Sequence, residues 1–245
     1  MAGEPLWEPS TGDIMTLTNQ DIACHFHVYQ NVAATVDVLE RFRRVYSDAS
    51  IHLISDGGAD FSDAAKKHAC SYHHEPWNIG RQVNTSEDSI NEWLRRFRYV
   101  CDESTAPWIL ILEDDVLIRN QLAADIPYPM AGGSAGRANR RFYNGPLGKY
   151  LYDRHPHLVN NGYGGGGGTL VYRTSAIEAI EAYFANESFD HWKSMAGGIT
   201  ASDLWLTTMM MAVGYQYGPN PDMSEQSNWQ QTNCAIIHRW KDHSK

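Results

Sequence analysis

Three consecutive carboxylates, Glu113, Asp114 and Asp115, follow the apolar run "WILIL" at residues 108–112. Within a buried strand these acids would repel one another and lose hydration, so we expect them at the strand's open end, beside a cation. Oxygen-rich sites of this kind bind hard divalent cations such as Mg²⁺ or Mn²⁺, which also bridge phosphate oxygens. Because side chains alternate along a strand, Glu113 and Asp115 should face one side, and Asp115 is the preferred ligand.

Two further acids and one histidine stand at expected strand ends or helix starts. Asp56 closes the apolar run "IHLIS" (residues 51–55) and precedes two glycines, which permit a tight turn against a planar ligand. Asp203 follows Ser202 at an expected helix start, where an acid either caps the helix or takes a proton as a general base. His238 in "AIIHRW" is either a semi-buried polar residue on the last strand or a Mn²⁺ ligand.

A run of glycines, Gly162 and then Gly164 to Gly168, precedes the apolar segment "TLVYR" at residues 169–173. The run is either a flexible surface loop or a place where missing side chains let a ligand approach the backbone. No Lys-Ser/Thr pair follows and no helix is expected to begin there, so the run does not fit a phosphate-binding loop. We expect a ligand to contact it.

The first half of the chain alternates between strand and helix patterns. Strands are expected at about residues 22–31, 51–55, 70–74 and 108–113, and helices at about 32–46, 61–69 and 85–101. Apolar residues recur at helical spacing in the first helix (Val32, Val36, Leu39, Phe42 and Val45) and in the last (Ile90, Trp93, Leu94, Phe97 and Cys101). Thr85 or Ser86 can cap the last helix.

This order of elements predicts an α/β fold with a mixed, mostly parallel sheet and helices on its faces. Ligands of such sheets bind beyond the carboxyl ends of the strands, so residues 20–118 are expected to form a nucleotide-binding half. Residues 119–160 show no regular spacing of apolar residues and are expected to form a long segment with loops. A strand at 169–173, a helix at 174–185 with a Ser175–Glu178 capping box and a helix at 200–215 should follow.

Composition excludes several classes of protein. The 245 residues carry a formal net charge of −9, which argues against nucleic-acid binding because that needs a basic surface. No uninterrupted apolar stretch approaches the ~20 residues that span a bilayer. The acidic start "MAGEPLWEPSTGD" does not resemble a secretion signal, and four scattered cysteines indicate free thiols, so we expect a cytoplasmic protein.

Several segments together resemble the GT-A class of nucleotide-sugar glycosyltransferases. "ILILEDDV" looks like the acidic metal-binding motif of that class, "HLISDGG" like the strand end that holds base and ribose, and "PWNIGRQVN" like the loop that packs on the nucleotide. "GYGGGGGTLVYR" resembles the glycine-rich segment of Fringe-like β-1,3-glycosyltransferases. "TASDLWL" resembles the acidic helix start that supplies the base in inverting members, and "AIIHRW" the late metal-binding histidine.

The resemblance covers about residues 20–240 as an order of motifs and implies one GT-A-like domain over 1–245, with an acceptor and catalytic half at about 160–245. It implies Mn²⁺ or Mg²⁺ held by Asp115 and His238, and Asp203 as catalytic base. Asp190, Asp222 and Glu225 are the alternative bases. The expected nucleotide-sugar contacts are Asp56, Asn78, Gly80, Arg81, Glu113, Asp114, Gly165 and Gly166.

The sequence therefore predicts a metal-dependent glycosyltransferase that moves a sugar, with inversion, from a nucleotide-sugar donor such as a UDP-sugar to a hydroxyl acceptor such as a glycan. Two alternatives remain open at this point. A sugar-phosphate nucleotidyltransferase has a similar fold, but it would carry a Gly-rich, Arg/Lys-containing loop where this chain has "YQNVAATVD". A carbohydrate- or nucleotide-binding module could keep the fold without turnover.

Overall fold

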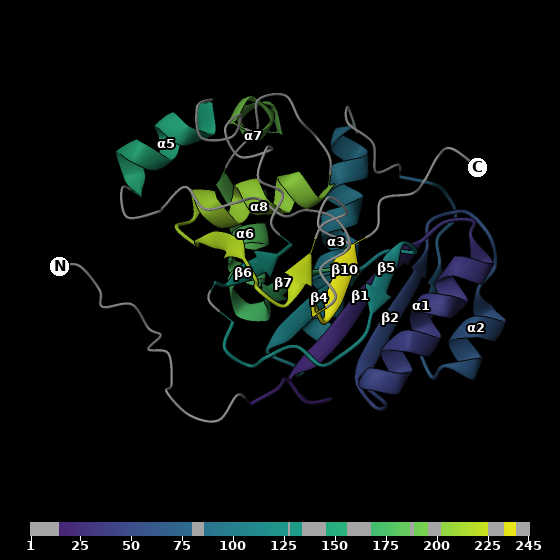
Figure 1. Cartoon of the computed structure of the whole chain (residues 1–245). Coiled ribbons are helices and arrows are strands. Elements are labelled where there is room, and N and C mark those ends of the chain that lie inside the picture. Colours follow the sequence, from purple (N-terminus) through teal and green to yellow (C-terminus); the bar gives the residue numbers. More distant parts are fainter. Residues whose placement is uncertain are drawn as a thin grey trace, which may run out of the picture.

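A seven-stranded sheet in the spatial order β3–β2–β1–β4–β7–β6–β8 forms the centre of the chain (Figure 1). The computed structural model describes residues 15–79, 86–126, 128–133, 146–155, 168–186, 189–195, 202–224 and 233–238. The strands of this sheet are β1 (Ile22–Val28), β2 (Ser50–Ser55), β3 (Ser71–His74), β4 (Trp108–Leu112), β6 (Met130–Gly132), β7 (Thr169–Tyr172) and β8 (Tyr217–Pro219). A second sheet, ordered β5–β10–β9, consists of β5 (Val116–Ile118), β9 (Met223–Ser224) and β10 (Ile236–His238).

The large sheet is mixed and mostly parallel. β3, β2, β1 and β4 run parallel to one another, β7 is antiparallel to both β4 and β6, and β8 is parallel to β6. The helices are α1 (Val32–Val45), α2 (Ser62–Lys67), α3 (Glu87–Glu103), α5 (Pro146–Arg154), α6 (Arg173–Asn186), α7 (Phe189–Met195) and α8 (Ser202–Ala212). The predicted α/β fold class, a mostly parallel sheet flanked by helices, is therefore confirmed.

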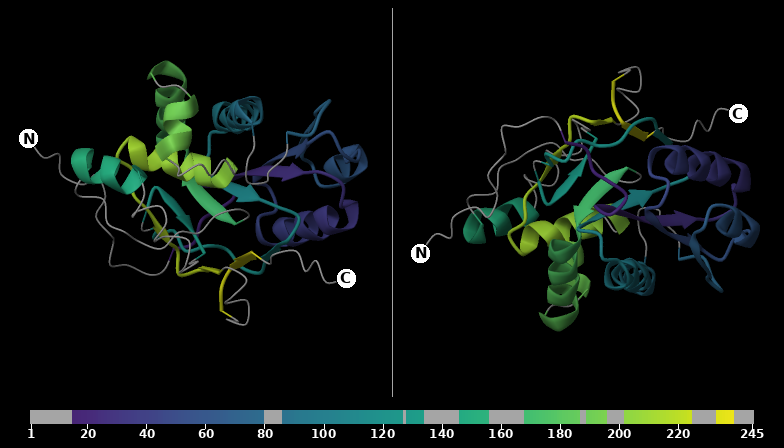
Figure 2. Two further views of the ribbon diagram at one scale, coloured as in Figure 1. Left: turned by 90° about the horizontal axis from the view of Figure 1, so that it is seen from above. Right: turned by 90° about the horizontal axis from the view of Figure 1, so that it is seen from below.

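Both faces of the large sheet are buried, and β4 shows how one strand serves both. Ile109 and Ile111 of β4 belong to the apolar cluster under α3, α6 and α8, whereas Leu110 and Leu112 belong to the cluster under α1 and α2. The two views in Figure 2 place α3 and α1 on opposite sides of the sheet. A strand that is buried on both faces has an uninterrupted apolar sequence, which explains why "WILIL" does not alternate between apolar and polar residues.

The predicted apolar stripe of α3 is confirmed, since all five of its predicted residues are buried. Ser86 is the N-cap, and its hydroxyl accepts a hydrogen bond from the backbone N–H of Ser89 at 3.2 Å. The stripe predicted for α1 was partly wrong. Leu39 and Phe42 are buried as expected, but Val32 is 41% exposed and the buried face turns toward Thr35 and Val38 instead.

The second half contains structure that periodicity did not reveal. β6 and α5 lie within the segment predicted to be loops, and each is too short for a clear apolar repeat. The predicted Ser175–Glu178 capping box is wrong, because α6 begins at Arg173, directly after β7, and Ser175 is buried inside the helix. The Glu178 carboxylate instead accepts a hydrogen bond from the hydroxyl of Tyr215.

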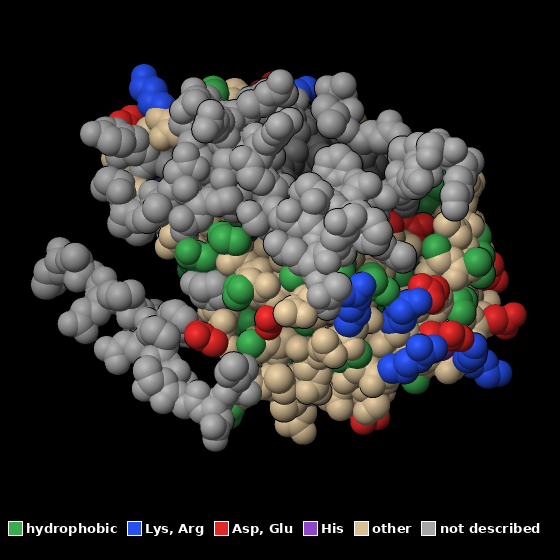
Figure 3. Space-filling view, viewed as in Figure 1, with side chains coloured by type: hydrophobic (Ala, Val, Ile, Leu, Met, Phe, Trp, Pro, Cys, Tyr) green, Lys and Arg blue, Asp and Glu red, His purple; other side chains and the backbone are tan. Residues whose placement is uncertain are grey.

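The outer surface of α1 and α2 carries charges of both signs. On the face shown in Figure 3, Lys and Arg side chains lie among Asp and Glu side chains over these helices, and the ion pairs there include Arg41–Asp37 and Lys67–Glu40. All four cysteines are free thiols. Within the described part of the chain, no helix combines the length and the apolar character that a membrane span needs.

Candidate metal and nucleotide site

Glu113, Asp114 and Asp115 form the turn that connects β4 to β5. This turn lies at the carboxyl end of a central strand, which pairs with β1 on one side and β7 on the other. β5 then pairs antiparallel with β10, and the register places His238 opposite Val116, the residue that follows Asp115. The pairing of β10 with β5 thus places His238 next to the acidic turn.

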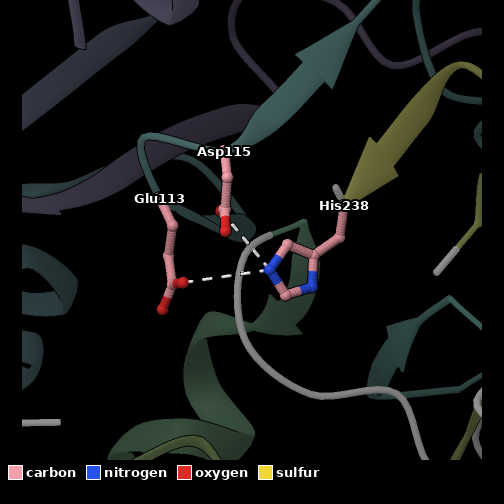
Figure 4. A group of neighbouring side chains, drawn as sticks. All are labelled: Glu113, Asp115 and His238. Carbon is pink, nitrogen blue, oxygen red and sulfur yellow. Dashed lines mark ion pairs between the residues drawn. The ribbon is translucent and has the colours of Figure 1, made fainter. Parts of the chain in front are cut away.

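The side chains of Glu113, Asp115 and His238 converge (Figure 4). One ligand atom from each lies within 4.8 Å of the other two. Nε2 of His238 is 3.4 Å from Oδ1 of Asp115 and 3.9 Å from Oε2 of Glu113. All three side chains are half-buried, so they are held in place by the fold and still reach solvent.

The donor set fits a divalent cation. Oδ1 of Asp115 is buried and makes no hydrogen bond within the described residues, although it faces the His238 ring at ion-pair distance. An orphaned carboxylate oxygen is costly unless a cation or proton compensates it. Two carboxylates and one imidazole form an oxygen-rich mixed site that suits Mn²⁺, whereas Mg²⁺ accepts imidazole less readily.

Glu113 gains a second candidate role. The sequence predicted a contact to the nucleotide sugar, and the structure also places the Glu113 carboxylate in the candidate ligand group with Asp115 and His238. The expectation that Glu113 and Asp115 share a side holds, although the three acids form a turn and not a continuing strand. Asp114 is half-buried and lies outside that group, so a contact to the nucleotide sugar remains its predicted role.

Asp56, the predicted nucleotide ligand at the end of β2, is only 2% exposed. Its Oδ1 accepts hydrogen bonds from the backbone N–H of Ile79 at 3.0 Å and from Nη1 of Arg96 at 2.9 Å, and Nε2 of His27 lies 3.7 Å away. Burial alone would raise the pKa of Asp56, but His27, the Ile79 N–H and Arg96 outweigh it and lower the pKa to about 2. Asp56 is therefore a charged group that binds protein partners.

Sequence reasoning missed Arg96, although a signal was available. Arg96 stands three residues after Trp93 and four before Val100, on the same helical face as the apolar stripe of α3. A charged residue on a stripe that faces the core must have a buried partner. Asp56 is that partner.

The backbone segments after β1, β2 and β3 are in close contact. A Cβ added to Gly57, which has a φ of +66°, would lie 2.4 Å from the carbonyl carbon of Trp77, and one added to Gly58 would lie 1.7 Å from the carbonyl oxygen of Tyr29. Only glycine fits here. Tyr29 and Trp77 remain 43% and 41% exposed, and Asn78, a predicted nucleotide contact, is also exposed.

Several predicted site residues cannot be placed beside these groups. Gly80, Arg81, Gly165 and Gly166 lie outside the described residues, as does the alternative base Glu225. Asp203 is the second residue of α8, as its predicted helix start requires, but its side chain lies outside the described part. Of the other alternative bases, Asp190 is exposed on α7, and Asp222 accepts a hydrogen bond from the Ala123 N–H at 2.8 Å.

Comparisons with known proteins agree with this architecture. No protein-family model matches the chain, and no curated protein matches it in sequence. The galactosyltransferase LgtC in complex with donor and acceptor sugar analogues aligns over 90% of this chain and 87% of its own, with a TM-score of 0.53 and 11% identity. An active-site mutant of LgtC gives a TM-score of 0.52 at 10% identity, over 89% of this chain and 87% of that one.

The glycosyltransferase GlyE of Streptococcus pneumoniae, in its apo form, aligns over 90% of this chain but only 54% of its own, with a TM-score of 0.49 and 13% identity. The two LgtC alignments, at 11% and 10% identity, establish the fold alone. The chain therefore has the mixed α/β fold of GT-A glycosyltransferases.

Proposed function

We propose that the chain is a metal-dependent glycosyltransferase that moves a sugar from a nucleotide-sugar donor, a UDP-sugar in our expectation, to a hydroxyl acceptor such as a glycan. One observation carries this proposal. Glu113, Asp115 and His238 converge at the carboxyl end of a central strand, in a fold shared with glycosyltransferases. Ligands of open α/β sheets bind beyond such strand ends.

Glu113, Asp115 and His238 would hold Mn²⁺ or Mg²⁺. When bound, a divalent cation neutralises the charge that develops on the departing nucleoside diphosphate. The protein's part is to fix the three donors: β4 and β5 position the acidic turn, and the β5–β10 pairing positions the imidazole. Asp114, in the same turn, would contact the donor.

The nucleoside would lie over the ends of β1, β2 and β3. β2 and β4 flank β1 on opposite sides, so their ends are about 10 Å apart, a span that a nucleoside diphosphate can bridge. Residues 20–118 would thus bind the nucleotide, and Asp56, Asn78, Gly80 and Arg81 would lie on the nucleotide side of the site. Residues 160–245 would supply the acceptor side, including Gly165, Gly166 and Asp203.

Asp203 would act as the base of an inverting reaction. In a single displacement, one carboxylate takes the proton of the acceptor hydroxyl while the oxygen attacks the anomeric carbon and the bond to the diphosphate breaks. Asp203 comes from the second half of the chain, after the glycine-rich segment, and so from a different element than the candidate metal ligands.

A donor screen tests the proposal. Nucleotide sugars with different bases are incubated with the protein and Mn²⁺, and the released nucleoside phosphate is measured, with Asp115→Asn as the matched inactive variant. We expect hydrolysis of a UDP-sugar that requires both Mn²⁺ and Asp115. Binding without any turnover would indicate a binding module. Formation of a nucleotide sugar from a sugar 1-phosphate and a nucleoside triphosphate would indicate a nucleotidyltransferase.

A further inference from the structure

Arg96 of α3 is a buried guanidinium that contacts the ends of three neighbouring strands. It is 5% exposed. Nη1 donates a hydrogen bond to Oδ1 of Asp56, which follows β2, at 2.9 Å, and lies 3.2 Å from Nε2 of His27 in β1. Nη2 lies 3.6 Å from Oε2 of Glu75, which follows β3. Nε donates to Oε1 of Glu92 on α3 itself at 3.1 Å.

Apart from these polar partners, the face of α3 that carries Arg96 is mostly apolar and aromatic. On the same face of α3, Trp93 and Phe97 stack with their ring centroids 5.2 Å apart, and His25 contacts both rings edge-on. Replacing a buried ion pair with well-packed apolar residues is often neutral or stabilising, so the stability of the fold alone is a weak reason for an arginine here. The fixed geometry that it imposes is the stronger reason.

Backbone hydrogen bonds connect the residues that Arg96 holds. The Asp56 N–H donates to the Val28 carbonyl at 2.8 Å, and the Glu75 N–H donates to the Ser55 carbonyl at 2.9 Å. The Ile79 N–H donates to the Asp56 carboxylate at 3.0 Å. The guanidinium therefore constrains three chain segments at once: the end of β1, the turn after β2 and the segment after β3.

Two of those three segments also carry an exposed aromatic residue. Tyr29 follows β1 and packs against Gly58, and Trp77 follows β3 and packs against Gly57. Because the glycine contacts are tight, a shift of one segment must displace its neighbour. The positions of Tyr29 and Trp77 therefore depend on the turn that Arg96 holds through Asp56.

We infer that Arg96 is a positioning residue for the nucleoside part of the donor. It holds the Asp56 turn and the segment after β3 in the arrangement that receives the nucleoside, and it does not touch the donor itself. The inference rests on the proposed function for the presence of a nucleotide. It assigns no role to Arg96 at the Glu113, Asp115 and His238 group, which lies about two strand spacings away.

The test compares two arginines of α3. Arg96→Gln removes the charge, Arg96→Lys keeps the charge but cannot bridge three segments, and Arg98→Gln is the matched control. Arg98 donates to Asp102 at 2.8 Å and to Glu181 at 2.9 Å, and both of those partners lie on helices. The first readout is amide hydrogen exchange. The Ile79 and Glu75 amides should exchange about tenfold faster or more in Arg96→Gln, while the rest of α3 and β4 keeps its protection.

The second readout is the affinity for UMP without metal and for pyrophosphate with Mn²⁺. In Arg96→Gln, the affinity for UMP should fall about tenfold or more, and the affinity for Mn²⁺-pyrophosphate should hardly change. The reason is that a displaced turn misplaces only the nucleoside contacts. Arg96→Lys should fall between Arg96→Gln and the wild-type protein, and Arg98→Gln should match the wild type. If Arg96→Gln does not fold, the amide exchange and the two ligand affinities of Arg96→Lys test the inference instead.

Three results would overturn the inference: unchanged exchange of the Ile79 amide, unchanged UMP affinity despite faster exchange, or an equal loss of affinity for both ligands. A wild-type protein that binds neither UMP nor Mn²⁺-pyrophosphate would overturn the proposed function, and with it the donor role of Arg96. Even then, the exchange rates would decide whether Arg96 holds these segments.

Discussion

Nε2 of His238 lies 3.4 Å from Oδ1 of Asp115, although the two residues come from opposite halves of the chain. The antiparallel pairing of β10 with β5 creates this proximity. With a hydrogen on Nε2, the imidazole can donate a hydrogen bond to the carboxylate, whereas a bare Nε2 faces the carboxylate oxygen favourably only when a cation lies between them. A proton on Nε2 and a metal ion between the two side chains therefore compete.

Asp115→Asn should reduce the Mn²⁺-dependent affinity for UDP by about 10² or more, because an amide oxygen replaces a charged ligand at the centre of the group. The amide keeps the size of the side chain, so the melting temperature should change little. Titration calorimetry of UDP with and without Mn²⁺ measures the effect. Asp125→Asn, which removes an exposed carboxylate outside the group, is the control. Equal affinity in the wild-type protein and Asp115→Asn would refute the metal assignment.

His238 should make metal binding dependent on pH. An imidazole binds a metal only when it is deprotonated. The affinity for Mn²⁺ should therefore fall as the pH is lowered, because protons compete for Nε2. His238→Ala should weaken Mn²⁺ binding less than Asp115→Asn does and should remove this part of the pH dependence. If the Mn²⁺ affinity of His238→Ala has the same pH dependence as that of the wild-type protein, His238 has a structural role and is not a metal ligand.

Asp56 should make the stability of the fold sensitive to acid. The partners of Asp56 lower its pKa from 3.8 to about 2, so its charged form contributes about 2 kcal/mol that is fully present above pH 4 and is lost as the pH falls through 2. The unfolding free energy of Asp56→Asn should be lower than that of the wild-type protein at pH 6, and the difference should shrink between pH 4 and pH 2. Urea titrations at these pH values measure it. A difference that is constant with pH would contradict the assigned ion pair.

The longer elements of the first half, such as α3 and β4, could be predicted because each is long enough to show its pattern. α3 repeats its apolar residues over about three turns, from Ile90 to Cys101, and β4 is a continuous apolar run because both of its faces are buried. The start of α1 shows the limit of this reasoning. Val32 fits the helical spacing, yet it is exposed because the helix turns Thr35 and Val38 toward the sheet.

The candidate site was predictable only in part, because it depends on a non-local pairing. The acidic turn is visible in the sequence, but β5, β9 and β10 contain only two or three residues each, too few for a periodic signal. The contact between His238 and the acidic turn therefore had to come from a resemblance. The pair formed by Arg96 and Asp56 is equally non-local, since α3 and the end of β2 meet only in the folded sheet.

Asp203→Asn should lower turnover by about 10² or more while leaving donor affinity almost unchanged. An amide keeps the size and hydrogen bonding of the carboxylate but cannot accept the acceptor's proton, so the loss should fall on kcat. Asp203 is the second residue of α8, whose following turns pack into the core through Trp205 and Leu206, so the helix should form in the variant as well. Asp125→Asn, a change at an exposed acid that is not a candidate base, is the matched control.

The anomeric configuration of the first-formed product, followed by proton NMR, decides the stereochemical half of this prediction. A base that activates the acceptor for direct displacement gives inversion, because the oxygen attacks from the face opposite the departing diphosphate and no covalent intermediate forms. Inversion together with an inactive Asp203→Asn would support the assignment. Near-normal turnover in Asp203→Asn would direct the search to Asp190, Asp222 or Glu225. Retention would rule out a single displacement and with it any role for Asp203 as the base of an inverting reaction.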